Sequence, residues 1–215
     1  MKGLKMNKIW WEKTVEYKFI CDYCGHSLLM PLDGAQEKAG DTILSNSKKF
    51  MLIEFKKEFK NIKDELKKFN IRIENDIPNK IKNLGLKSLM FHKIIYGTLE
   101  NEKFILQEVN YWDGLTKNLK GNTFDKNIFK NGIELKKFKA YIEIFINLKK
   151  AIITNESGSN SFANYTNVLG IDSNGNVNQV ISLNEFAKEI LNENLDNKQT
   201  LNQNHTLKYN SGPKL

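Results

Sequence analysis

Several kinds of residue are scarce in this chain, and each scarcity excludes a class of protein. Only two cysteines occur among 215 residues, too few for the disulfide framework that holds small secreted domains together. No apolar run approaches the roughly 20 residues that a membrane-spanning helix needs. The N-terminal stretch carries Glu12 and Glu16 where a secretory signal would need uncharged apolar residues. We therefore expect a cytoplasmic protein without a membrane partner.

Arginine is almost absent as well, because Arg72 is the only arginine among the 33 basic residues. The net charge is nevertheless +8, and the isoelectric point is near 9.2. Clusters of lysine gain affinity for polyanions by neutralising phosphates, so a polyanion such as a nucleic acid is an expected partner. Asparagine and isoleucine are also abundant, so part of the positive charge reflects a general composition and not a binding face.

The periodicity of apolar residues indicates one α/β domain over residues 1–192, with a mixed central β-sheet flanked by helices. A polar, asparagine-rich segment over residues 193–215 is expected to be disordered. Helices are predicted near residues 7–20, 55–69, 134–150 and 183–191. Strands are predicted near residues 27–30, 40–44, 49–55, 89–96, 103–109, 168–172 and 177–181.

The tripeptide Glu-Phe-Lys occurs twice between Met51 and Lys60, and the two copies are expected on different backbones. Glu54 and Lys56 belong to a predicted strand, where side chains two residues apart point to the same side. The second copy opens a predicted helix, where residues two apart lie about 200° apart around the axis and cannot meet at one ligand. Only the first copy is therefore a candidate site.

The expected hairpin adds a second acid to this pair. A turn around residues 47 and 48 would place Asp41 opposite Glu54 on the neighbouring strand. Two carboxylates would then converge beside one ammonium group, and a hard divalent cation relieves such repulsion. Asp41 and Glu54 are therefore candidate ligands of Mg²⁺ (or Mn²⁺). A slip of one residue in the register would turn one of them away.

These residues resemble the core motif of the PD-(D/E)XK, or restriction-endonuclease-like, phosphodiesterase superfamily. The similar letters are Gly40-Asp41, a hairpin's worth of residues, and then Leu52-Ile53-Glu54-Phe55-Lys56. The expected elements over residues 7–96 also follow the order of that family's core, αβββαβ, here with C-terminal additions. Glycine stands at position 40, where the family has proline. The resemblance implies a Mg-dependent endonuclease or exonuclease that hydrolyses phosphodiester bonds in DNA.

The resemblance also implies a role for each matching residue. Asp41 and Glu54 would bind the metal, and Lys56 would orient or activate the attacking water. An acid on the first helix, Glu12 or Glu16, would assist. The letters WEKTV around Glu12 are closer to the family's aromatic-Glu-x-x-aliphatic pattern, so Glu12 is preferred.

The biological setting follows only by analogy with other small nucleases of this class. Many of them act in defence, restriction or mobile-element systems, which implies a protein partner in a larger system. A protein that keeps the nuclease-like scaffold without catalysis, and uses it to bind a nucleic acid or a protein, is the alternative interpretation.

Two further groups of residues are weaker candidates. Cys21, Cys24 and His26 resemble half of a zinc site, but the chain has no second cysteine pair, so two ordinary thiols are the preferred interpretation. Tryptophans can stack nucleic-acid bases. Trp11 recurs at helical spacing with Val15 and Phe19, which favours a place in the core.

Overall fold

Within the residues that the structure describes, the centre of the fold is a mixed β-sheet of seven strands. The structure is a computed structural model of the whole chain, and it describes residues 9–24, 28–29, 47–69, 71–73, 76–149 and 166–187. The strands are β1 (Leu28–Leu29), β2 (Lys49–Lys56), β3 (His92–Glu100), β4 (Lys103–Asn110), β5 (Asn122–Thr123), β6 (Thr166–Ile171) and β7 (Val177–Ser182). They lie side by side in the order β1-β7-β6-β2-β3-β4-β5.

Helices connect and cover these strands. They are α1 (Glu12–Phe19) with its π-helical extension η1 (Ile20–Cys24), the 3₁₀ helix η2 (Phe59–Lys68), α3 (Asn79–Lys82), α4 (Tyr111–Lys117), the 3₁₀ helix η3 (Lys126–Asn131), α5 (Leu135–Leu148) and α6 (Leu183–Phe186). The α/β class with a mixed sheet flanked by helices is therefore confirmed. Within the described ranges, no helix is long and apolar enough to cross a membrane.

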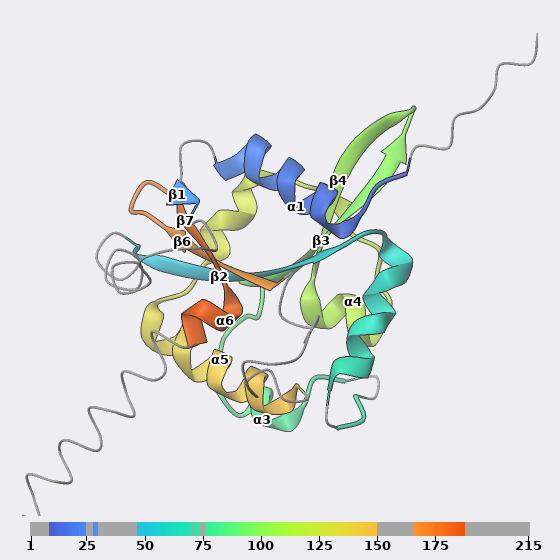
Figure 1. Cartoon of the computed structure of the whole chain (residues 1–215). Helices are drawn as coiled ribbons and strands as arrows, with labels where there is room; N and C mark the ends of the chain where they lie inside the picture. Colours follow the sequence, from blue (N-terminus) through green and yellow to red (C-terminus); the bar gives the residue numbers. More distant parts are fainter. Residues whose placement is uncertain are drawn as a thin grey trace, which may run out of the picture.

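The helices form a layer on each side of the sheet (Figure 1). α1 crosses one side, whereas α3, α4, α5 and α6 lie on the other. Alternate residues of β2 reach the two layers: the ring of Phe55 packs on Phe19 of α1, with centroids 5.4 Å apart, and Phe50 packs on Phe138 of α5 at 5.7 Å. Because side chains alternate along a strand, Glu54 and Lys56 belong to the α5 side. The predicted separation of Phe55 from this pair is confirmed.

The connection from β2 to β3 determines what lies beside this pair. β2 and β3 are parallel, with Leu52 beside His92, and parallel neighbours need a crossover segment. η2 and α3 provide it. The predicted order of strand, helix and strand over residues 49–96 is confirmed, but the helix that follows β2 is a 3₁₀ helix. Residues three apart share a face in that geometry, which places Ile62, Glu65 and Lys68 in one row.

The strand predicted to pair with β2 is not one of its neighbours in the sheet. Thr166 of β6 lies beside Glu54 on the antiparallel side, and Ile94 of β3 lies beside it on the parallel side. Both edges of β2 are therefore occupied at Glu54, and the prediction that Asp41 faces Glu54 across a hairpin was wrong. Asp41 itself, with the rest of the predicted strand over residues 40–44, lies outside the described residues.

The C-terminal part of the domain follows its local sequence signals. β6 and β7 form the predicted hairpin around Asn174-Gly175, where Gly175 has a φ of +83°. Ser182 Oγ accepts a hydrogen bond from the Glu185 backbone at 3.2 Å, so the predicted capping box opens α6. The expected end of this helix near residue 191 and the tail over residues 193–215 lie outside the described residues.

Candidate functional site

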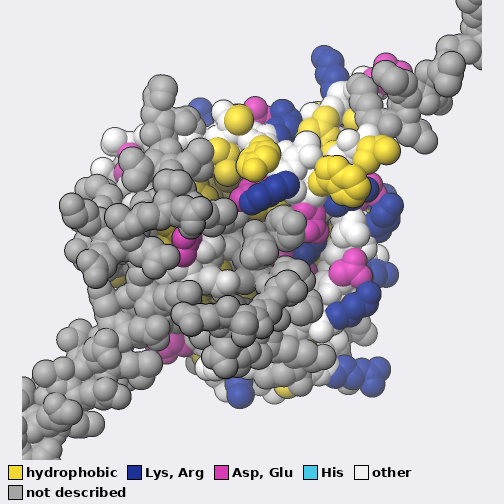
Figure 2. Space-filling model, in the orientation of Figure 1, with side chains coloured by type: hydrophobic (Ala, Val, Ile, Leu, Met, Phe, Trp, Pro, Cys, Tyr) yellow, Lys and Arg dark blue, Asp and Glu magenta, His cyan; other side chains and the backbone are white. Residues whose placement is uncertain are grey.

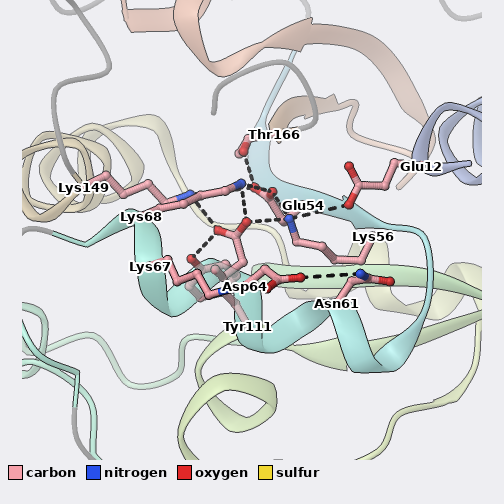
Figure 3. A network of polar contacts seen from close by, with 11 residues as sticks. Glu12, Glu54, Lys56, Asn61, Asp64, Lys67, Lys68, Tyr111, Lys149 and Thr166 are labelled. Atoms are coloured by element: carbon pink, nitrogen blue, oxygen red, sulfur yellow. Dashed lines mark hydrogen bonds and ion pairs between the residues drawn. The ribbon is translucent and has the colours of Figure 1, made fainter. Parts of the chain in front are cut away.

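Glu54 and Lys56 lie next to each other at the C-terminal end of β2 (Figure 3). Lys56 Nζ donates a hydrogen bond of 2.9 Å to Glu54 Oε1. Both residues are buried, with 0% and 3% of their surface exposed. The strand puts them together because residues two apart project from the same side of the sheet. The two Glu-Phe-Lys copies lie on different backbones, as predicted, because Glu58 precedes η2 and Lys60 lies at its start. The prediction that Glu58 and Lys60 cannot meet was wrong: Glu58 is extended and not yet helical, and Lys60 Nζ pairs with its carboxylate at 2.7 Å on the exposed surface.

A second buried carboxylate, Glu65 of η2, completes the centre of this group. Its Oε1 lies 2.5 Å from Lys56 Nζ. Its Oε2 accepts hydrogen bonds from Tyr111 Oη and from Lys149 Nζ, each at 3.1 Å. Lys68, one turn further along η2, contacts both Glu54 and Glu65. Four elements of the chain therefore meet at this point: β2, η2, α4 and the end of α5.

Among the described residues, the charges in this cluster balance. Three glutamates, Glu12, Glu54 and Glu65, face three lysines, Lys56, Lys68 and Lys149. Burial by itself would raise the pKa of the Glu54 carboxyl, but the surrounding ammonium groups outweigh this and hold that pKa well below its usual value. Burial would lower the pKa of Lys56, yet the adjacent carboxylates raise it. Lys56 is therefore protonated at neutral pH.

Of the two acids expected on the first helix, the structure brings only Glu12 to the cluster. Glu12 Oε1 lies 4.0 Å from Lys56 Nζ. Burial is also the main reason that the pKa of Glu12 is raised above its usual value. Glu16 points elsewhere: its carboxylate pairs with Lys13 at 2.7 Å and accepts a hydrogen bond from Asn167 of β6 at 3.4 Å.

A layer of polar and aromatic side chains supports the cluster from behind. Thr166 Oγ1 donates a hydrogen bond to Glu54 Oε2. His92 stacks on Tyr111 with ring centroids 3.8 Å apart, and its Nδ1 lies 2.5 Å from Tyr141 Oη. Burial lowers the pKa of His92 well below its usual value, so this ring is neutral. Its role is to hold Tyr111 against Glu65.

The described residues do not form a metal site by themselves. No group of three or more histidine, cysteine or acidic side chains within the described ranges is arranged to hold an ion. Glu54 and Glu65 are instead in contact with ammonium groups, which already neutralise them. A divalent cation at Glu54 would therefore need further ligands, and the expected one, Asp41, lies outside the described residues.

The cysteine pair shows no sign of a zinc site in the described part of the chain. Cys21 is exposed, Cys24 is buried, and the two are not joined by a disulfide. Burial raises the pKa of Cys24 to about 12, which disfavours the thiolate that binds zinc. His26 lies outside the described residues.

Sequence reasoning missed Glu65, Lys68, Lys149 and Thr166. Glu65 belongs to the helix predicted near residues 55–69, where a period of 3.6 residues per turn directs it partly away from the core. The 3₁₀ period of exactly three residues per turn aligns it with the buried Ile62. The spacing of three residues between Ile62, Glu65 and Lys68 was the signal in the sequence that could have indicated this shared face. Lys149 and Thr166 are 95 and 112 positions from Glu54, and no local pattern connects them.

Comparison with known proteins adds no relative: no family model, no curated protein and no solved structure matches this chain.

Proposed function

We propose that this protein is a metal-dependent nuclease that hydrolyses phosphodiester bonds in DNA, with Glu54 and Lys56 at its centre. One observation carries the proposal. Glu54 and Lys56 share one side of β2, a crossover leads from that strand to the parallel β3, and Glu12 of the first helix approaches Lys56 within 4.0 Å. This conjunction of strand, crossover and helical acid is what the resemblance to the PD-(D/E)XK superfamily implies.

The protonation of Lys56 limits the role that it can have. A protonated lysine cannot accept a proton, so Lys56 would act as a positive charge and hydrogen-bond donor, not as a base. Glu54 and Glu65 use two of its three N–H donors. The third donor is suited to a phosphate oxygen or to the water that attacks it.

The metal requirement is part of the proposal and rests on the resemblance, which implies Asp41 as the second ligand. Mg²⁺ or Mn²⁺ would neutralise charge on the scissile phosphate and lower the pKa of a bound water. Glu54 would be one ligand and Asp41 the other. Binding at Glu54 would also compete with the ammonium groups that now contact this carboxylate.

A direct test compares cleavage of supercoiled, linear and single-stranded DNA, with and without Mg²⁺ or Mn²⁺. We expect metal-dependent cleavage that is lost in Asp41→Ala and in Lys56→Met. Methionine keeps the length of the side chain without its charge, and thermal melting checks that each variant is folded. Lys60→Ala, in the second Glu-Phe-Lys copy, is the matched control and should keep full activity because Lys60 is exposed.

A second candidate function is supported by the charge balance of the cluster. Ammonium groups that neutralise both buried glutamates can serve to hold β2, η2 and the end of α5 together without catalysis. The protein would then be a nuclease-like scaffold that binds a nucleic acid or a protein. A folded wild-type protein that binds DNA but cuts none of the three substrates with either metal would favour this function over the first.

A further inference from the structure

An exposed tryptophan stands directly beside the candidate site. Trp11 immediately precedes α1, and 66% of its surface is exposed. Its predicted place in the core with Val15 and Phe19 was wrong. The reason is its extended backbone, with φ −123° and ψ 169°, which puts Trp11 outside the helix whose buried side the other two residues share. Burial of this large ring would be favourable, so its exposure suggests a binding role.

Two pairs of chain neighbours place Trp11 next to the cluster. Glu12 and Lys56 form the inner pair, 4.0 Å apart. Trp11, which precedes Glu12, and Lys57, which follows Lys56, form the outer pair. Lys57 Nζ lies 5.2 Å from the centre of the Trp11 ring. Such a distance allows a cation–π contact. An aromatic ring and an ammonium group therefore stand one residue outside the inner pair.

The outer pair is held in place by Trp10. Trp10 Nε1 donates a hydrogen bond of 2.8 Å to the backbone oxygen of Lys57, and its ring packs on Phe104 of β4 at 5.2 Å. The chain leading into α1 is thereby fixed to the end of β2. Figure 2 shows exposed hydrophobic side chains, with lysine and acidic side chains among them, along the part of the surface where Figure 1 places α1.

We propose that Trp11 and Lys57 bind an unpaired nucleotide of single-stranded DNA, with the ring stacked on its base and the ammonium group paired with its phosphate. An indole ring accepts any base, because every base has a π face. In a duplex both faces of each base are covered by its neighbours, so an exposed ring of this kind selects unpaired strands. This inference rests on the proposed function and names the form of its substrate.

The charges favour a nucleic acid over an apolar partner. Lys57 also lies 4.0 Å from Glu58, a contact long enough to leave its ammonium group able to pair with a phosphate. The whole chain carries a net charge of +8, which attracts a polyanion at long range.

The test measures binding without cleavage, using the full chain in EDTA. Fluorescence anisotropy follows a labelled oligothymidine strand and, separately, a labelled duplex of the same length. We expect Trp11→Ala to weaken binding of the single strand by about fivefold or more and to leave binding of the duplex unchanged. Trp11→Phe should restore most of the affinity, because phenylalanine also stacks.

Tyr17→Ala is the matched control. Tyr17 is another aromatic residue of α1, with 59% of its surface exposed, and it lies six positions beyond Trp11. Its removal should leave binding of both DNA forms unchanged. Binding of oligothymidine should also quench tryptophan fluorescence in the wild type and much less in Trp11→Phe, because Trp112 is buried and Trp10 is packed on Phe104.

The proposal is overturned if Trp11→Ala leaves single-strand binding unchanged, if it weakens duplex binding equally, or if Tyr17→Ala has the same effect. A wild type that binds no DNA also overturns it. Its failure is distinct from failure of the proposed function. Single-strand binding that depends on Trp11, in a protein that cuts no DNA, would contradict only the nuclease. If cleavage depends on Lys56 but binding of the single strand does not depend on Trp11, only this inference is contradicted.

Discussion

Replacing Glu65 by glutamine tests whether the buried cluster holds the fold together. Glutamine keeps the shape of the side chain but removes one negative charge from a group in which, within the described ranges, three carboxylates balance three ammonium groups. Lys149, with only 3% of its surface exposed, would then lose its nearest carboxylate. Removing one partner of a buried ion pair costs about 3–5 kcal/mol, a large part of the roughly 5–15 kcal/mol that stabilises a domain.

Urea denaturation followed by circular dichroism measures this cost. With an m-value of about 2 kcal/mol per molar urea, the midpoint should fall by about 2 M in Glu65→Gln. The double variant Glu65→Gln with Lys149→Met also removes the ammonium group that has lost its nearest carboxylate, so it should be more stable than the single variant. Asp22→Asn is the surface control: its pair with Lys18 is partly exposed, and its loss should cost less than about 1 kcal/mol.

The reasoning would be refuted in two ways. One is a midpoint for Glu65→Gln that moves no further than that of Asp22→Asn. The other is a double variant that is no more stable than the single one.

Two further predictions concern His92 and Gly97. Burial lowers the pKa of His92 in the folded state below 6.5. Near pH 6.5 and below, the imidazole therefore takes up a proton only in the unfolded chain. The free energy of unfolding should fall as the pH drops below about 6.5, by up to about 1.4 kcal/mol per pH unit. Urea midpoints between pH 5 and 8 should show a shallower slope for His92→Phe, and an identical slope would contradict the assignment. A Cβ at Gly97 would lie 2.4 Å from the ring of Phe104 and 2.8 Å from Trp10 Nε1. Gly97→Ala should therefore lower the free energy of unfolding by about 1–3 kcal/mol. A melting temperature equal to that of the wild type would show that the two rings move aside freely.

The elements that local sequence signals predicted are largely those that formed. β2 follows from a β-prone run, and the β6–β7 hairpin follows from Asn174-Gly175, which tolerates positive φ. The nearness of Glu54 to Lys56 could be predicted for the same reason, because the strand period of two acts between chain neighbours. Of the two acids expected on the first helix, Glu12, the preferred one, is the one that approaches Lys56.

The predictions that failed depended on non-local pairing or on a change of helical geometry. A strand has two edges, and the sequence does not say which segments occupy them, so β6 with Thr166 took the position expected for Asp41. The 3₁₀ winding of η2 moved Glu65 onto the buried side. Trp11 does not share the buried side of α1, because the helix begins one residue after it and the backbone of Trp11 is extended.

The sequence by itself therefore determined the strand that presents Glu54 and Lys56 and the order of strand, helix and strand around it, because these depend on periodicity and turn chemistry within a few residues. Only the tertiary structure decided that Glu65, Lys68 and Lys149 surround this pair, and that an exposed Trp11 stands beside it. Charges from distant segments meet when the strands and helices pack, and their burial then determines which groups are ionised.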